Sequence, residues 1–329
     1  MQIYNKKDIQ TSFALFGITL ITLGFSAYIL SVLMGFLRRL ISPFILFNKD
    51  SIITLLWYSG LPIVVGFFLL SVDLFFKVQQ KRKIKKTTYK KIKKEEITVL
   101  LTAYNDEKSI GLAVNDFMRS KFVKRVVVIS NNSNDNTEFV AQKSGAIVFN
   151  EPKQGYGSCV YRALYESLKF KDSEIICLCE GDMTFRAKDL EKLLAYIDHG
   201  DVVNGTRIVE QLQEADTQIT MFMHYGNLAV AKLLEFKYLG SATLTDVGTT
   251  YKIIRKSALK KLIPKLNSDI NLDFNPYFLE KCIQNDLGII ECPINFHPRV
   301  GLSKGGNKSN FHAFKLGATM IFRIIFGWK

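Results

Sequence analysis

The chain has few cysteines, and they are not grouped as metal-binding cysteines are. It holds five cysteines in 329 residues, and the only tight spacing is Cys177-x-Cys179, inside an apolar run. Successive residues of a strand point to opposite faces, so this pair is poorly placed to grip a metal ion. The pattern argues against a cysteine-based metal site and favours buried, reduced thiols in a cytosolic domain.

Excess positive charge is concentrated in one run, and the rest of the chain is much closer to charge balance. The net charge is +14, and the segment from Lys77 to Lys94 reads KVQQKRKIKKTTYKKIKK. No nucleic-acid motif accompanies this run, and it directly follows an apolar stretch. Such a position is typical of a segment that faces anionic lipids beside a membrane. We therefore expect membrane lipids as partners, and no nucleic acid.

Two stretches near the N-terminus carry no charge at all, about residues 11–37 and 51–72. About 20 apolar residues suffice to cross a hydrocarbon core of about 30 Å, so each stretch is predicted to be a transmembrane helix of an anchor over residues 1–76. The first is too long for a cleaved signal peptide and has no small-residue cleavage site. Two buried core helices are the alternative interpretation.

The distribution of cations around these stretches predicts their orientation. The loop between them holds three cations, whereas the basic linker after the second, residues 77–95, holds many more. Lys and Arg resist translocation, so we expect an integral membrane protein whose large C-terminal part lies on the cytoplasmic face.

The last segment, residues 306–329, has apolar residues at helical spacing around Lys315, Arg323 and Lys329. It is too short and too charged to span a membrane. We predict an amphipathic helix at the membrane interface, with its cations and Trp328 at headgroup level. Packing against the preceding domain is the alternative.

Between these segments, over residues 96–305, short β-rich runs alternate with longer amphipathic ones. ITVLLTAY, RVVVIS and EIICLC are examples of the short runs, and KSIGLAVNDFMRS is one of the longer ones. This βαβ rhythm predicts an α/β domain with a mostly parallel sheet and flanking helices. Ligands of such sheets bind beyond the carboxyl ends of the strands.

Polar clusters follow three of these predicted strands, at residues 102–107, 130–137 and 180–184. In the third cluster, Glu180 and Asp182 flank a glycine and can both leave the strand end toward one point. Hard oxygen ligands at this spacing suit Mg²⁺ or Mn²⁺, and such an ion can bridge a substrate diphosphate. For an acid-x-acid pair by itself, a solvated loop end is the alternative.

Seven segments in order, between residues 97 and 304, resemble the successive motifs of family 2 glycosyltransferases: ITVLLTAYNDEKSI, VVVISNNSNDNT, EPKQGYGSCVYRAL, ICLCEGDMTF, DVVNGTRI, LTDVGTTYKIIRKSAL and IIECPINFHPRVGLSK. They are most similar to the dolichol- and polyprenyl-phosphate hexose synthase branch. The resemblance implies a Rossmann-like GT-A fold, a divalent metal, and inverting transfer of a hexose from a GDP- or UDP-sugar to a polyprenyl or dolichyl phosphate.

The resemblance also implies roles for single residues. It gives contacts with the nucleotide-sugar to Thr102, Tyr104, Asp106, Asn131, Lys153, Gly155, Gly157 and Glu180. It gives the metal to Glu180 and Asp182, with Thr184 nearby. It gives the acceptor phosphate to Arg207, His224, Arg299, Ser303 and Lys304, although a structural role is an equal alternative for His224. The catalytic set that it implies is Asp182, Arg207, Asp246 and Arg299.

Two departures from the family pattern bear on the site. Ser130 and Asn131 stand where the family usually has acids, so base recognition is expected to differ or the donor to be unusual. Glu180 replaces the commoner aspartate of the metal motif, which lengthens one arm of the pair by a methylene.

Three other functions compete with this interpretation. A lipid phosphate is already ionised near neutral pH and needs no general base, but a transferase that extends a lipid-linked diphosphate or glycan would need one, with Asp246 or Asp273 as candidates. A processive polysaccharide synthase would carry a Gln-x-x-Arg-Trp motif, which Trp57 and Trp328, the only tryptophans, do not form. A catalytically silent membrane scaffold is the third. The sequence leaves the sugar, the nucleobase and the oligomeric state open.

Overall fold

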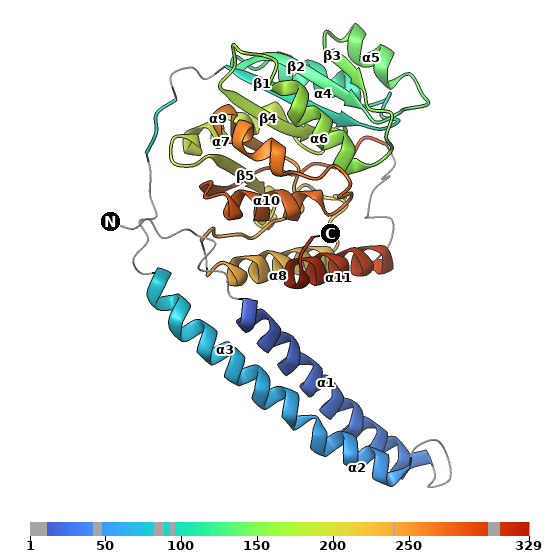
Figure 1. The fold of residues 1–329 in the computed structure, drawn as a ribbon. Helices are drawn as coiled ribbons and strands as arrows, with labels where there is room; N and C mark the ends of the chain where they lie inside the picture. The colour runs from blue at the N-terminus through green and yellow to red at the C-terminus, as the bar shows by residue number, and fades with distance from the viewer. Residues whose placement is uncertain are drawn as a thin grey trace. The chain divides into compact units, whose positions relative to one another are not determined.

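The computed structural model describes residues 12–41, 48–81, 89–92, 96–239, 241–301 and 310–328. They fall into two units, an N-terminal helical hairpin and a larger α/β unit (Figure 1).

The hairpin consists of α1 (Ser12–Ile41), α2 (Lys49–Tyr58) and α3 (Gly60–Lys81). It provides two candidate membrane spans, Ser12–Leu40 and Lys49–Val78, each long and apolar enough to cross a bilayer. The second span is interrupted at Ser59, where α2 ends and α3 begins. The two stretches that the sequence marked as apolar are therefore helical, and helix continues into the first residues of the predicted basic linker.

The helices α1 and α3 approach so closely that only glycine fits at their contact. A Cβ atom on Gly17 would lie 2.5 Å from the carbonyl oxygen of Gly66, and one on Gly66 would lie 2.5 Å from the carbonyl oxygen of Gly17. A Cβ on Gly24 would lie 2.7 Å from the carbonyl oxygen of Ser59. Such small-residue contacts are typical of helix pairs in membranes, where backbones come close together.

The hairpin also buries one acidic side chain. Asp73 of α3 is 4% exposed, and its Oδ2 accepts a hydrogen bond of 3.0 Å from the backbone N–H of Ala14 in the first turn of α1. Because the first N–H groups of a helix have no partner within the helix, Asp73 caps α1 from the neighbouring helix.

The α/β unit is built on a seven-stranded sheet with the order β3-β2-β1-β4-β6-β5-β7. The strands are β1 (Ile97–Ala103), β2 (Val123–Ser130), β3 (Ile147–Asn150), β4 (Ile175–Glu180), β5 (Val202–Thr206), β6 (Lys252–Arg255) and β7 (Ile289–Pro293). All neighbours pair in parallel except β6, which runs antiparallel to β4 and β5. The predicted mostly parallel α/β fold is confirmed.

Helices flank the sheet (Figure 1). They are α4 (Ile110–Met118), α5 (Thr137–Lys143), α6 (Tyr156–Ser167), α7 (Leu190–Ile197), α9 (Lys256–Leu262) and α10 (Phe274–Gln284). Two further helices, α8 (Met221–Lys237) and α11 (Asn310–Phe326), lie away from the sheet, below α10 in the view of Figure 1. Short 3₁₀ turns lie at Ala187–Asp189, Glu210–Leu212 and Ile263–Lys265. At the start of this unit, the backbone N–H of Ile92 donates to Asp198 Oδ1 at 2.9 Å.

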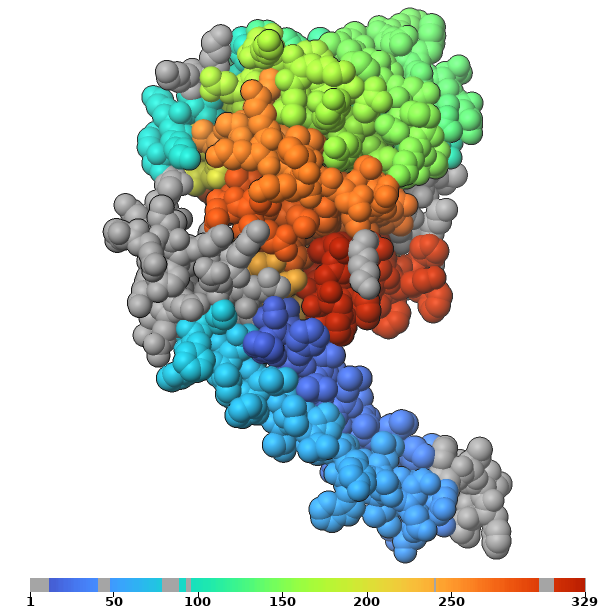
Figure 2. Space-filling view, in the orientation of Figure 1, coloured from blue at the N-terminus to red at the C-terminus, as the bar shows by residue number. Residues whose placement is uncertain are grey.

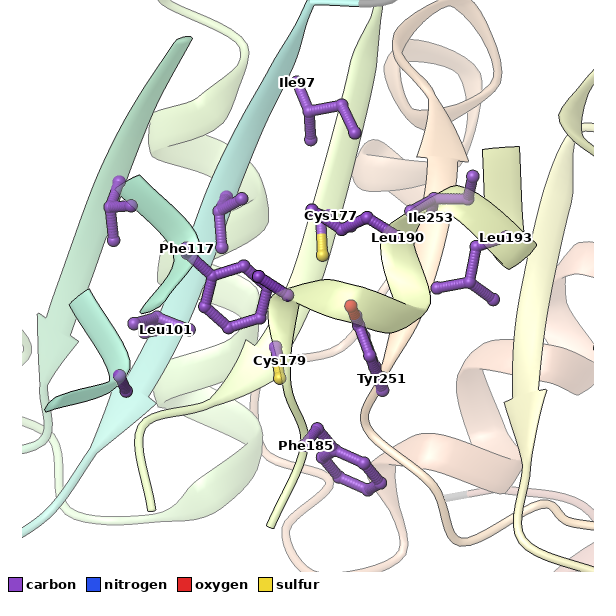
Figure 3. Packing of buried hydrophobic residues seen from close by; sticks show 14 of the residues in the cluster. Ile97, Leu101, Phe117, Cys177, Cys179, Phe185, Leu190, Leu193, Tyr251 and Ile253 are labelled. Carbon is purple, nitrogen blue, oxygen red and sulfur yellow. The ribbon is translucent and has the colours of Figure 1, made fainter. Parts of the chain in front are cut away.

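The apolar core lies between one face of the sheet and helices α4 and α7 (Figure 3). Its members come from alternate positions of the central strands, as expected where one residue in two faces each side. They include Ile97, Leu101, Phe117, Cys177, Cys179, Phe185, Leu190, Leu193, Tyr251 and Ile253. All five cysteines are free and buried, as the composition predicted.

Strand order brings the polar clusters to one edge of the sheet. After β1 the chain turns to β2 on one side, whereas β4 pairs with the other side of β1, so that Thr102 lies beside Glu180. This reversal is a switch point of the kind at which ligands bind. Since β6 is antiparallel, its first residue, Lys252, pairs with Leu178 near the carboxyl end of β4. The segment that precedes β6 therefore reaches the same edge.

The C-terminal helix α11 is fastened to α10 (Figure 2). Arg323 Nη1 donates to Asp273 Oδ2 at 2.5 Å, and Trp328 Nε1 donates to Glu280 Oε2 at 2.6 Å. Trp328, expected at headgroup level, thus contacts the domain, because a buried carboxylate accepts its indole N–H. Apolar side chains of α11 remain exposed, among them Phe311, Phe314, Phe322 and Phe326. The interfacial position of α11 stays a prediction.

Candidate active site

Glu180 and Asp182 lie together at the carboxyl end of β4. Glu180 is the last residue of the strand, and Asp182 follows after one glycine with no exposed surface. Burial, and then the charge of Asp182, raises the pKa of Glu180 to about 7. Both acids therefore lie at the strand end where the sequence predicts the metal pair.

One oxygen of Asp182 is positioned as a ligand would be. Its Oδ1 accepts hydrogen bonds from the backbone N–H (3.0 Å) and the hydroxyl (2.6 Å) of Thr184. Its Oδ2 is buried without a hydrogen bond in the described part of the chain, although Arg299 Nη1 lies 3.1 Å away in an unaligned direction. A buried carboxylate oxygen without a donor is costly unless a cation completes it.

These two acids fit a Mg²⁺ or Mn²⁺ ion that is shared with a substrate. Among the described residues, no three His, Cys, Asp or Glu side chains gather into a metal cluster. Such ions are commonly held by one or two carboxylates, with water and substrate phosphates as the other ligands. The donor set thus suits a metal that binds together with a diphosphate.

The loops at this edge carry non-glycine residues with left-handed backbone conformations. Asn105 (φ 52°), Asn132 (φ 55°) and Met183 (φ 70°) follow β1, β2 and β4 respectively. Asparagine tolerates this region, whereas for methionine it costs energy that the surrounding structure must supply. The sharp turns keep the polar residues that follow each strand close to the sheet edge.

Arg299 lies between carboxylates of two different strand ends. Its Nη1 is 3.1 Å from Asp182 Oδ2, and its Nη2 is 3.7 Å from Asp106 Oδ1. The backbone N–H of Val300 donates to the carbonyl of Asp182 at 3.0 Å, which anchors the Arg299 loop to the metal strand. Ser303 and Lys304, predicted for the acceptor phosphate, lie outside the described residues.

Arg207, at the end of β5, forms a buried two-pronged ion pair with Asp246. Arg207 Nε and Nη2 donate to Asp246 Oδ2 and Oδ1 at 2.6 and 2.8 Å. Asn227 of α8 donates to Oδ1 at 2.5 Å, as does the backbone N–H of Gly248 at 3.0 Å. Burial disfavours the ionised form of Asp246, but the Arg207 guanidinium outweighs it and lowers its pKa. Asp246 is thereby held as an ion and fixes the position of Arg207.

The side chain of Asn131 makes hydrogen bonds with the loop that precedes α6. Its Oδ1 accepts from the N–H of Gly155 and its Nδ2 donates to the carbonyl of Lys153, both at 2.8 Å. Gly155 has φ 145°, which favours glycine, and a Cβ on Gly157 would lie only 1.6 Å from the carbonyl oxygen of Ile270. The glycines are therefore required by loop shape and by packing, whatever they do for a donor.

Thr102, Tyr104 and Asp106 lie at the same edge, at and after the end of β1. The carbonyl of Thr102 accepts from the N–H of Gly181 at 3.0 Å, and Asp106 Oδ2 accepts from the N–H of Tyr104 at 2.9 Å. Lys153 pairs at the surface with Asp269. His224, in the first turn of α8, lies edge-on to Tyr225. It precedes Asn227, whose side chain donates a hydrogen bond to Asp246, by one helical turn.

The sequence did not indicate four residues that are linked to Glu180 by hydrogen bonds, either directly or through one another. They are Tyr156, Thr250, Lys252 and Asn275, and Thr250 Oγ1 donates to Glu180 Oε1 at 2.8 Å. A lysine within the apolar run of β6 was an available signal, since burying a charged side chain in a strand is costly. Asn275 carried no signal, because α10 reaches the site only through the tertiary fold.

Comparison with known protein families identifies the family of the chain. The model described as "Glycosyl transferase family 2" matches residues 98–263. The chain belongs to glycosyltransferase family 2. The matched residues of this glycosyltransferase run from β1 to the 3₁₀ turn after α9 and include Glu180, Asp182, Arg207 and Asp246, whereas Arg299 lies beyond them.

Several curated proteins are similar to this glycosyltransferase. A dolichyl-phosphate hexose transferase of Haloferax volcanii is 29% identical over 211 residues, which cover 64% of this chain and 86% of that protein. The low-salt glycan biosynthesis hexosyltransferase Agl6 of the same organism is 25% identical over 210 residues, covering 62% of this chain and 48% of that protein.

Among solved structures, the glucosyl-3-phosphoglycerate synthase of Mycobacterium tuberculosis, in complex with Mn²⁺, UDP and phosphoglyceric acid, is similar in fold. The TM-score is 0.52 at 15% identity, over 71% of this chain and 80% of that chain. This likeness, with the family match, confirms the predicted GT-A fold of the glycosyltransferase domain.

Proposed function

We propose that this glycosyltransferase transfers a hexose, with inversion, from a GDP- or UDP-sugar to a polyprenyl or dolichyl phosphate at the cytoplasmic face of a membrane. The observation that carries the proposal is the grouping of Glu180, Asp182 and Arg299 at the switch point of the sheet. Two acids and one guanidinium at this place suit a metal-bound diphosphate.

The donor half of the site would hold the leaving group. Glu180 and Asp182 would hold Mg²⁺ or Mn²⁺, which when bound neutralises charge that develops on the departing diphosphate. Arg299 is already within 3.1 Å of Asp182 Oδ2, so its planar fork can turn from that carboxylate to phosphate oxygens. The 151–157 loop, held by Asn131, would close around the nucleotide part of the donor.

The acceptor half would bind an anion that needs no activation. A lipid phosphate is ionised near neutral pH and can attack without a general base. Arg207 uses Nε and Nη2 for Asp246, so we assign Nη1 to the acceptor phosphate. Asp246 receives several hydrogen bonds and Asp273 pairs with Arg323, and such committed carboxylates are poor candidates for the base that a sugar-hydroxyl acceptor would require.

A lipid acceptor also agrees with the rest of the chain. The hairpin offers two candidate spans, and a relative is named a dolichyl-phosphate hexose transferase. Exposed aromatic side chains on α8 and α11, including Phe222, Tyr225, Phe314 and Phe322, suit contact with lipid. A membrane anchor would keep enzyme and lipid at one depth and so raise the effective concentration of the acceptor.

The test is direct reconstitution. The purified full chain in detergent micelles is incubated with polyprenyl phosphate, Mg²⁺ or Mn²⁺, and a panel of UDP- and GDP-sugars, and the lipid is analysed by mass. We expect a sugar-charged lipid phosphate with at least one donor, and none in the presence of a chelator. Product only from a lipid-linked diphosphate would favour the alternative transferase, and neither transfer nor donor hydrolysis would favour a silent scaffold.

A further inference from the structure

A series of polar side chains connects the interior of the α/β unit to Glu180. Lys252 Nζ donates to Asn275 Oδ1 at 3.1 Å, and Asn275 Nδ2 donates to the Tyr156 hydroxyl at 2.9 Å. That hydroxyl lies 2.5 Å from Thr250 Oγ1, which donates to Glu180 Oε1 at 2.8 Å. Lys252, Asn275 and Thr250 are 0%, 5% and 1% exposed. The series joins α6, α10 and the start of β6, which are distant in sequence.

The chemistry of the two ends sets the direction of every hydrogen bond in this series. A carbonyl only accepts, and Asn275 Nδ2 donates to the carbonyl of Gly248 at 3.1 Å, so Asn275 turns its amino group to Tyr156 and its carbonyl oxygen to Lys252. Thr250 donates its single hydroxyl hydrogen to Glu180 and therefore accepts from Tyr156. All hydrogens in the series thus point from Lys252 toward Glu180.

This direction fixes one oxygen of Glu180. The Thr250 hydroxyl donates to Oε1, so the carboxyl group is held in one orientation. Donors that are connected in series also polarise one another. Lys252 is held firmly at its end, because Nζ also donates to the carbonyls of Thr249 and Thr250 at 2.6 and 3.1 Å.

We propose that Lys252, Asn275, Tyr156 and Thr250 are positioning residues that hold Oε1 of Glu180 through the Thr250 hydroxyl and so orient its second oxygen, Oε2, toward the divalent cation. The inference rests on the proposed function, since it needs a metal ion at Glu180 and Asp182. Loss of a residue that hydrogen-bonds to a metal ligand typically changes metal affinity by about 10- to 100-fold. Tyr156 is the first residue of α6, so the series also ties the 151–157 loop to Glu180.

The chain offers a matched pair of threonines for the test. Thr249 and Thr250 are adjacent and both buried, but Thr249 Oγ1 has no hydrogen-bond partner in the described part of the chain. Thr→Val keeps the shape and removes only the hydroxyl. Thr250→Val breaks the series next to Glu180, whereas Thr249→Val removes a hydroxyl of the same kind and depth outside it.

The measurement is Mn²⁺ binding by the full chain in detergent micelles, followed by electron paramagnetic resonance in the presence of UDP or GDP. We expect Thr250→Val to weaken Mn²⁺ binding about 10- to 100-fold, Thr249→Val to bind like wild type, and Thr250→Ser to restore affinity. A fold defect would not be repaired by serine alone, which separates positioning from a merely structural role.

A second variant keeps the test informative if Thr250→Val does not fold. Tyr156→Phe removes the donor to Thr250, and we expect a smaller loss of Mn²⁺ affinity. In a Thr250→Val background it should have no further effect, because the series is already broken. Wild-type Mn²⁺ affinity in either single variant would overturn the inference. Absence of Mn²⁺ binding by the wild type with both nucleotides would instead overturn the proposed function.

Discussion

The hairpin and the α/β unit are organised in opposite ways. In the hairpin, large apolar side chains such as Leu61, Val64 and Phe68 are 63–68% exposed, and the helix contact is made by glycine backbone. In the α/β unit, apolar side chains fill the interior, and ionisable groups gather at the buried edge of the sheet.

This difference follows from what surrounds each part. Burying apolar surface stabilises a domain in water by about 25 cal/mol per Å², but it gives no advantage to helices whose surroundings are as apolar as they are. Helices in lipid depend on close backbone contact instead. The pattern of exposure thus agrees with a hairpin in lipid and an α/β unit in water.

In the α/β unit, the largest expected effect comes from removing the charge of Asp182 without changing the shape of its side chain. We expect Asp182→Asn to lower the transfer rate by about a thousandfold, about 4 kcal/mol, because the metal loses an anionic ligand. Asp172→Asn, at the other end of β4 in a surface ion pair with Arg125, is the matched control and should leave the rate unchanged. Unaltered turnover of purified Asp182→Asn would contradict the site assignment.

The hairpin is expected to be destabilised by added side-chain volume rather than by loss of a charge. Gly66→Leu forces a side chain against the backbone of α1 and should cost about 2 kcal/mol of stability. A Cβ on Gly60 has no neighbour within 4 Å among the described residues, so Gly60→Leu is the control. Thermal unfolding in detergent measures both. Equal melting temperatures would contradict the close contact between α1 and α3.

The buried acids of the sheet edge should make metal binding depend on pH. Burial and the Asp182 charge raise the pKa of Glu180 from 4.5 to about 7, so below this pH a metal must displace a proton. We expect Mn²⁺ affinity to rise about tenfold per pH unit up to pH 7 and to level off above it. The Glu180→Gln variant should bind Mn²⁺ weakly, and its Mn²⁺ affinity should not rise with pH in this way. A flat wild-type profile would refute the assignment of Glu180.

The smallest expected effect concerns the one buried acid of the hairpin that the structure describes. Asp73→Ala removes the cap on the N–H of Ala14 and should cost about 1 kcal/mol. Asp50→Ala, at an exposed position in the first turn of α2, serves as the control and should cost only a few tenths of a kcal/mol of stability. Their order in thermal unfolding checks the capping role, and equal losses would refute it.

The sequence predicted what depends on local pattern. Alternating apolar runs indicated the strands, and the acids after EIICLC indicated where Glu180 and Asp182 would emerge. Strand order is a property of the whole fold, so the antiparallel direction of β6 and the contact of Thr250 with Glu180 had no local signal. For the same reason, the engagement of Asn131 with the 151–155 backbone was not visible from its neighbours in sequence.

The reversed direction of β6 also bears on how this scaffold could be re-engineered. A designer who grafts loops onto a parallel sheet normally exchanges the segments that follow the strands. Here β5 and β6 are antiparallel neighbours, so the connection that follows β5 begins and ends at the edge of the sheet that carries the site. A chimaera that exchanges this connection would therefore transfer Arg207, Asp246 and Thr250 together, and its recombination boundaries should be drawn within β5 and β6.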